Sequence, residues 1–112
     1  PAASPGPTPP ATLAGPPADL LAAASAYFDG RYQEAVAALD GARYEAGPAA
    51  LQAHLLRAAS RHALYLLGGG RDEALRQAIA ADIQAVRRLD PAFEPDPSAF
   101  SPRFRELFRK GG

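Results

Sequence analysis

The chain has 112 residues, a length that favours a single domain. Its 12 basic and 12 acidic residues balance, so no net charge attracts it to nucleic acid or to an anionic membrane. The absence of cysteine excludes disulfides, thiolate nucleophiles and cysteine metal sites. No apolar run approaches the ~20 residues of a membrane-spanning helix, so we expect no direct membrane span.

Residues 1–17 form a proline-rich segment that contains seven of the twelve prolines and no charge. Proline lacks an amide donor and restricts the residue before it, which predicts an extended tether of the polyproline type. Two roles remain open: a tail without function, or a spacer that leads to an anchor or docks along a partner. We expect no uncleaved signal peptide, and we do not expect Pro1 to be a fresh leader-peptidase end.

Residues 18–89 predict a domain of four helices in two antiparallel pairs. The first helix is expected over about 19–29, with Asp19 as its N-cap and Gly30 directly after it. The second is expected over about 32–43. The apolar residues at helical spacing in these two helices are Leu20, Ala23, Tyr27, Tyr32, Ala35, Val36 and Leu39.

The third predicted helix covers about 48–67 and begins at Pro48, a residue favoured at the first helical position. The fourth covers about 71–89, with Asp72 and Glu73 in its first turn, where negative charge complements the helix dipole. We expect the buried face of the third helix to contain Leu51, Leu55, Leu56, Ala59, His62, Ala63, Leu66 and Leu67. We expect that of the fourth to contain Leu75, Ile79, Ile83, Val86 and Leu89.

Residues 90–112 predict an extended strap followed by a short helix. Phe93 and Phe100 are the large apolar residues of the strap, and we expect them to hold it across the helical pairs. Ser101 and Pro102 are typical of the N-cap and first position of a helix. Its apolar edge would consist of Phe104, Leu107 and Phe108. The predicted fold class is therefore all-α.

The segment AYFDGRYQEAVAALDGA resembles a tetratricopeptide repeat, whose unit is a pair of antiparallel helices. The pattern departs from the family at Asp19 and Ala22, where a large aromatic residue and a leucine are usual, and Pro48 comes one position late. The second pair, 48–89, is longer than a standard repeat. The resemblance implies a degenerate repeat protein with a protein-binding role. The matching positions are Tyr27, Gly30, Tyr32, Ala35, Leu39 and Ala42.

The final segment, LDPAFEPDPSAFSPRFRELF, is similar to segments that follow degenerate repeats in bacterial envelope proteins. This resemblance implies a periplasmic or envelope-associated location. A cytoplasmic location remains the alternative.

The residues that could carry chemistry do not form a catalytic or metal-binding pattern. His54 and His62 are two helical turns apart, roughly 12 Å along the axis and too far for one metal ion. Asp72 and Glu73 are adjacent on a helix and point in different directions. The triple glycine at 68–70 follows a helix and lacks the lysine of a phosphate-binding loop. We therefore expect a protein that is not an enzyme and needs no cofactor or metal.

The pattern favours a non-enzymatic protein–protein interaction module, an accessory or scaffolding subunit of a bacterial envelope or membrane-associated complex. Aromatic and arginine side chains dominate protein contacts, and they supply the candidate binding residues. These candidates are Phe28, Tyr44, Arg57, Arg61, Phe104 and Phe108.

Two other functions remain open. The first is a regulatory domain that senses a small ligand in a pocket near His62, Tyr65 and Phe93. The second is a structural spacer that docks on a neighbour through the apolar edge of its last helix.

Overall fold

The computed structural model describes residues 17–40 and 47–111, and these residues form five α-helices. No strand occurs in these two ranges, so the predicted all-α class is confirmed for them. The end of the second predicted helix, the repeat position Ala42 and the candidate Tyr44 lie outside the described residues, as do residues 1–16 of the predicted tether. The helices are α1 (Ala18–Phe28), α2 (Tyr32–Asp40), α3 (Gly47–Leu67), α4 (Glu73–Leu89) and α5 (Pro102–Lys110).

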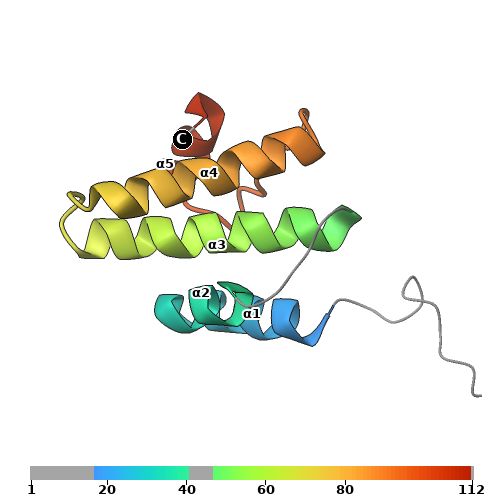
Figure 1. Ribbon diagram of the computed structural model, residues 1–112, viewed down its shortest axis with the longest axis horizontal. Helices are drawn as coiled ribbons and strands as arrows, with labels where there is room; N and C mark the ends of the chain where they lie inside the picture. Colours follow the sequence, from blue (N-terminus) through green and yellow to red (C-terminus); the bar gives the residue numbers. More distant parts are fainter. Residues whose placement is uncertain (1–16, 41–46, 112) are drawn as a thin grey trace, which may run out of the picture.

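The helices are arranged in layers around α3 (Figure 1). α3 and α4 lie side by side as the two longest helices, with α1 and α2 against the opposite side of α3 and α5 against α4. α2 packs against both α1 and α3. The segment between α4 and α5, residues 90–101, crosses back over the helices before α5 begins. From here on, the name strap is kept for its first part, residues 91–97, and Phe100 lies after the strap, just before α5.

α1 begins at Ala18, one residue before the predicted start at residue 19. Pro17 occupies the N-cap position without a side-chain hydrogen bond, and its carbonyl accepts from Leu21 N at 3.1 Å. Asp19 therefore lies in the first helical turn, where its carboxylate still complements the helix dipole. The prediction of Asp19 as the N-cap is wrong, because the proline carbonyl already starts the hydrogen-bond ladder.

The reversal between α1 and α2 depends on Gly30. Its φ of 82° lies in the left-handed region that residues with a side chain seldom adopt. Arg31 N then donates to Ala26 O at 2.8 Å, which closes the end of α1. The predicted glycine after the first helix is therefore found in the conformation that this position requires.

The interface between α3 and α4 contains the aliphatic stripe of α4, in which Ile79, Ile83 and Val86 are all buried. α4 starts after Asp72, whose side chain accepts from Leu75 N at 3.1 Å. Asp72 is therefore the N-cap and not a first-turn residue as predicted. α3 presents several alanines to its neighbours, which lets the helices approach closely. The buried residues of α3 are Ala50, Ala53, Leu55, Leu56, Ala58, Ala59, Ser60 and His62.

The last turn of α3 differs from the predicted stripe. Leu66 and Leu67 were expected on the buried face, but they are 38% and 76% exposed. Three glycines follow this turn, and the residues that lead into α4, Arg71, Asp72 and Glu73, are charged and exposed, so they do not cover these leucines. The core therefore ends before α3 does.

α5 packs against the hydrophobic core through its two phenylalanines. The Ser101 side chain accepts from Phe104 N at 3.1 Å and Pro102 opens the helix, so both predicted start signals are confirmed. Phe104 and Phe108 are buried, and the strap residue Phe93 packs against the same cluster. The large members of this core are Leu20, Leu39, Leu55, Leu56, Ile79, Ile83, Val86, Phe100, Phe104 and Phe108.

Candidate functional site

A buried carboxylate joins the middle layers of the fold. Asp82 of α4 has a side chain that is only 4% exposed, and its Oδ1 lies 3.0 Å from His54 Nδ1. Arg57 contacts both carboxylate oxygens, and Arg61 Nη1 donates to Oδ2 at 3.0 Å. Asp40, at the end of α2, accepts from Arg61 Nη2 at 3.2 Å. This ionic cluster therefore links α2, α3 and α4.

The ionic cluster limits how far its two arginines are available to bind a partner. Arg57 and Arg61 were predicted as partner contacts, but their side chains are 21% and 20% exposed and are bound to Asp82. The hydrogen bonds that Arg57 donates to Asp82 raise the pKa of Arg57, so its guanidinium stays charged. We interpret both arginines as structural, because a partner would have to displace Asp82 to use them.

Asp82 was not among the predicted site residues, although its position in the sequence carries a signal. Asp82 is three residues after Ile79 and directly before Ile83, and so lies within the stripe of α4 that was expected to be buried. A charged residue at such a position needs a partner of opposite sign on the facing helix. The arginines of α3 supply it.

The strap separates two hollows. The strap–α1 hollow, with a volume of about 290 Å³, lies between the strap, α1 and the first half of α3. Its walls are mostly apolar. They are formed by Ala24, Phe28, Gln52, Leu55, Leu56, Phe93, Glu94, Asp96, Ala99 and Phe100.

Two large apolar residues of α1 are exposed, and one of them borders this hollow. Phe28 is 62% exposed and lines it, and Leu21 is 55% exposed. The two are seven residues apart, so they lie on the same face of the helix, with Ala24 between them. Phe28 is thus the one described candidate contact whose side chain the structure leaves largely open to solvent.

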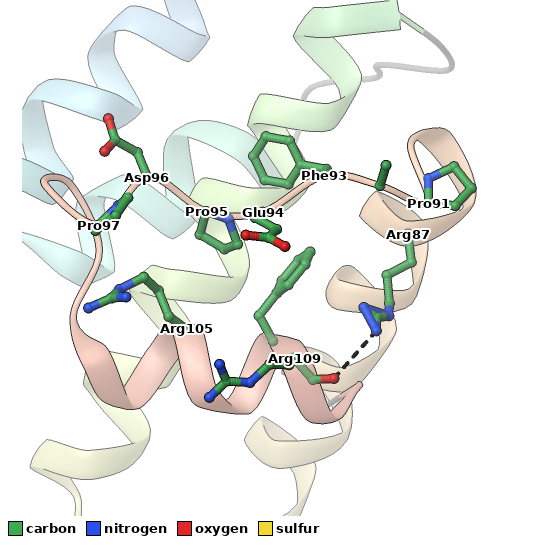
Figure 2. Close-up of a pocket in the computed structure, with 11 residues that line it drawn as sticks. Arg87, Pro91, Phe93, Glu94, Pro95, Asp96, Pro97, Arg105 and Arg109 are labelled. Atoms are coloured by element: carbon green, nitrogen blue, oxygen red, sulfur yellow. Dashed lines mark hydrogen bonds between the residues drawn. The ribbon is translucent and has the colours of Figure 1, made fainter.

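The strap–α5 hollow lies on the other side of the strap and is larger, about 590 Å³ (Figure 2). Charged side chains come from both walls: Arg87 from the end of α4, Arg105 and Arg109 from α5, and Glu94 and Asp96 from the strap. The remaining lining residues are Pro91, Ala92, Phe93, Pro95, Pro97 and Phe108.

Three residues are common to both hollows: Phe93, Glu94 and Asp96. The strap is therefore a shared wall. Asp96 is held within it, because its Oδ1 accepts from both N and Oγ of Ser98 at 2.9 Å. These bonds lower the pKa of Asp96 and keep it ionised.

The pocket expected near His62, Tyr65 and Phe93 does not form as predicted. His62 and Tyr65 line a hollow of about 150 Å³ together with Arg76, whereas Phe93 lies at the two strap hollows. Ligand pockets usually have about 300–1,000 Å³, so this space is small for that purpose. Burial, with the nearby charge of Arg103, lowers the pKa of His62.

The prediction of Phe104 and Phe108 as contact residues needs correction. Their side chains are 1% and 3% exposed, because α5 turns its apolar edge into the core. The other residues of that helix reach solvent instead. Phe104 is enclosed in the core, and Phe108 reaches the outside only where it lines the hollow between residues 91–97 and α5.

The described ranges contain no group of three histidine, cysteine, aspartate or glutamate residues that could hold a metal ion. None of the helices in these ranges is long and apolar enough to cross a bilayer. A comparison of the chain with protein-family models, curated proteins and solved structures found no match.

Proposed function

We propose that this protein is a non-enzymatic protein–protein interaction module, an accessory or scaffolding subunit of a larger assembly. One observation carries the proposal: Leu21 and Phe28 are exposed on one face of α1, and Phe28 also lines the apolar strap–α1 hollow. Full burial of one such side chain contributes about 1.5–3 kcal/mol, so a partner that covers both gains affinity from this face.

The chemistry of this surface favours an amphipathic helix or an apolar segment of the partner. Large apolar residues of the partner segment would fill the strap–α1 hollow and cover Phe28. Glu94 and Asp96 lie on the strap side of the same hollow, and they favour a lysine or arginine at the edge of the partner segment. Helix-in-groove binding has this combination of apolar anchors and flanking charge.

We also propose that the helices are degenerate tetratricopeptide-type pairs, α1 with α2 and α3 with α4. The contact between the rings of Tyr27 and Tyr32, 5.8 Å apart, supports this interpretation at the first turn. Ala35 and Leu39 are fully buried where the repeat pattern expects a small residue and a filling residue. A location in the bacterial periplasm or envelope is supported only by the resemblance of residues 89–108.

A site-specific crosslinking experiment tests the interaction surface. The photoreactive residue p-benzoylphenylalanine replaces Phe28, and a control chain carries it at Ala81, an exposed position on α4. After irradiation in the native cells, we expect one abundant adduct from position 28 and none from position 81. Unlabelled wild-type chain should suppress the adduct, whereas a Leu21→Ser/Phe28→Ser competitor should not.

Two outcomes of the crosslinking experiment would contradict the proposed interaction surface. The proposal fails if position 28 gives no adduct, or if positions 28 and 81 give the same mixture of adducts. Circular dichroism of both chains verifies that they remain folded.

A further inference from the structure

We propose that the strap–α5 hollow binds carboxylate groups on an extended, acidic segment of a partner protein. The inference rests on the proposed function as an interaction module and adds a second contact of defined chemistry. It starts from the three guanidinium groups that line this hollow, those of Arg87, Arg105 and Arg109.

Two of these guanidiniums are positioned by the protein itself. Arg87 Nη2 donates to Arg109 O at 3.4 Å, and its guanidinium carbon lies 5.4 Å from the centre of the Phe108 ring (Figure 2). Arg105 Nε donates to Phe100 O at 3.2 Å. A guanidinium has five N–H donors, so each of these two arginines keeps most of its donors available for a ligand.

The charges around the hollow are not paired with one another. Within residues 17–40 and 47–111, no carboxylate lies within 4 Å of a nitrogen of Arg87 or Arg105, whereas Arg109 pairs with Glu106. The helix dipole explains a cation at Arg87 or Arg109, since both lie in the last turns of their helices. It does not explain Arg105, which lies in the first half of α5, where positive charge is unfavourable.

The strap itself has few backbone donors, so binding of a partner segment depends on the arginine side chains. Three of its seven residues, Pro91, Pro95 and Pro97, have no backbone N–H to donate. A segment that lies along the strap therefore finds few main-chain donors and takes its hydrogen bonds from the arginines of the opposite wall. Carboxylates match this geometry, because a guanidinium binds them through two parallel bonds.

The other charged groups favour a protein segment over a nucleic acid. Glu94 and Asp96 line the same hollow, so a continuous phosphate backbone would be repelled on one side. The rings offer no stacking platform, because Phe93 and Phe108 meet edge to face at 6.0 Å and Arg87 covers Phe108. Discrete carboxylates that alternate with apolar side chains fit this surface better.

The test uses a fluorescein-labelled peptide of alternating glutamate and leucine, a matched peptide with glutamine in place of glutamate, and an oligothymidylate. Fluorescence anisotropy at low salt measures binding to the full chain. We expect the glutamate peptide to bind at least about tenfold more tightly than the glutamine peptide, because each guanidinium–carboxylate pair is charge-assisted.

Variants locate the site. Arg87→Gln/Arg105→Gln should weaken binding of the glutamate peptide by about tenfold or more. The control Arg88→Gln/Arg103→Gln removes the same charge from exposed positions outside the hollow and should bind like wild type. Glu94→Gln removes repulsion from the strap and should tighten binding, a gain that unfolding cannot produce.

The inference is overturned if the glutamate peptide does not bind, if both peptides bind equally, or if oligothymidylate binds more tightly. It is also overturned if the control variant loses as much affinity as Arg87→Gln/Arg105→Gln, or if Glu94→Gln does not tighten binding. The crosslink from position 28 does not depend on these arginines. An adduct without peptide binding refutes only this inference, and absence of the adduct refutes the proposed interaction surface.

Discussion

Arg57 and Asp82 form a two-pronged ion pair between α3 and α4, with Nε to Oδ2 at 3.0 Å and Nη2 to Oδ1 at 2.8 Å. The Asp82 carboxylate is nearly inaccessible to water, and it is compensated by hydrogen bonds from two arginines and by a contact with His54. A buried charge of this kind does not raise stability greatly compared with an apolar pair. We expect it instead to favour the relative position of the two helices in which Asp82 meets the arginines.

Replacement of Asp82 should therefore be costly. We expect Asp82→Asn to lower the free energy of unfolding by about 2–3 kcal/mol, because it leaves two partly buried guanidiniums with only the exposed Asp40 as a counterion. The control is Asp40→Asn, which removes a carboxylate that contacts the same arginines but is 53% exposed and should cost less than about 1 kcal/mol. Urea unfolding followed by circular dichroism measures both. If both variants lose the same free energy of unfolding, the expectation that the burial of Asp82 sets the cost is wrong.

The phenylalanines of α5 and α1 should respond differently to truncation. Phe104 is 1% exposed and packs against His62, Phe100 and Phe108, so Phe104→Ala should cost about 3–5 kcal/mol. Phe28 is 62% exposed, so Phe28→Ala should change stability by less than about 0.5 kcal/mol. Thermal and urea unfolding of the two variants check this. A large loss at Phe28 would mean that this residue belongs to the core and not to a binding face.

His62 should make stability depend on pH. Burial, together with Arg103, lowers its pKa in the folded state below the ordinary value of about 6.5. The unfolded chain then binds a proton that the folded chain does not, so stability falls as pH decreases from about 6.5 and levels off below the folded pKa. Urea midpoints between pH 5 and pH 8 should show this fall for wild type relative to His62→Gln. Parallel curves for the two proteins would contradict it.

The sequence predicts the helices of this protein well because their signals are local. The spacing of Ile79, Ile83 and Val86 predicts the presence of α4 and the middle of its buried face, whereas Leu89, expected on that face, is 37% exposed. Ser101 with Pro102 marks the start of α5. Gly30 is informative for the same reason, since its conformation is decided by its immediate neighbours in the chain.

The site was harder to predict because it depends on residues that are distant in sequence. The pattern of α5 shows that Phe104 and Phe108 share an edge, but it does not show whether that edge meets solvent or the core. Arg57 and Arg61 resemble exposed contact residues until Asp82, more than twenty positions later, is placed opposite them. The strap hollows are formed by three or four separate segments and have no local signal.

The position of Glu94 in the wall between the two hollows has a thermodynamic consequence. A ligand that moves the strap toward α5 enlarges the space beside α1 and reduces the space beside Arg105, and a ligand on the other side does the reverse. If such a displacement occurs, occupancy of one hollow changes the affinity of the other, and linkage requires the change to be equal in both directions. Two partner segments, one in each hollow, would then bind with positive or negative cooperativity without contacting each other.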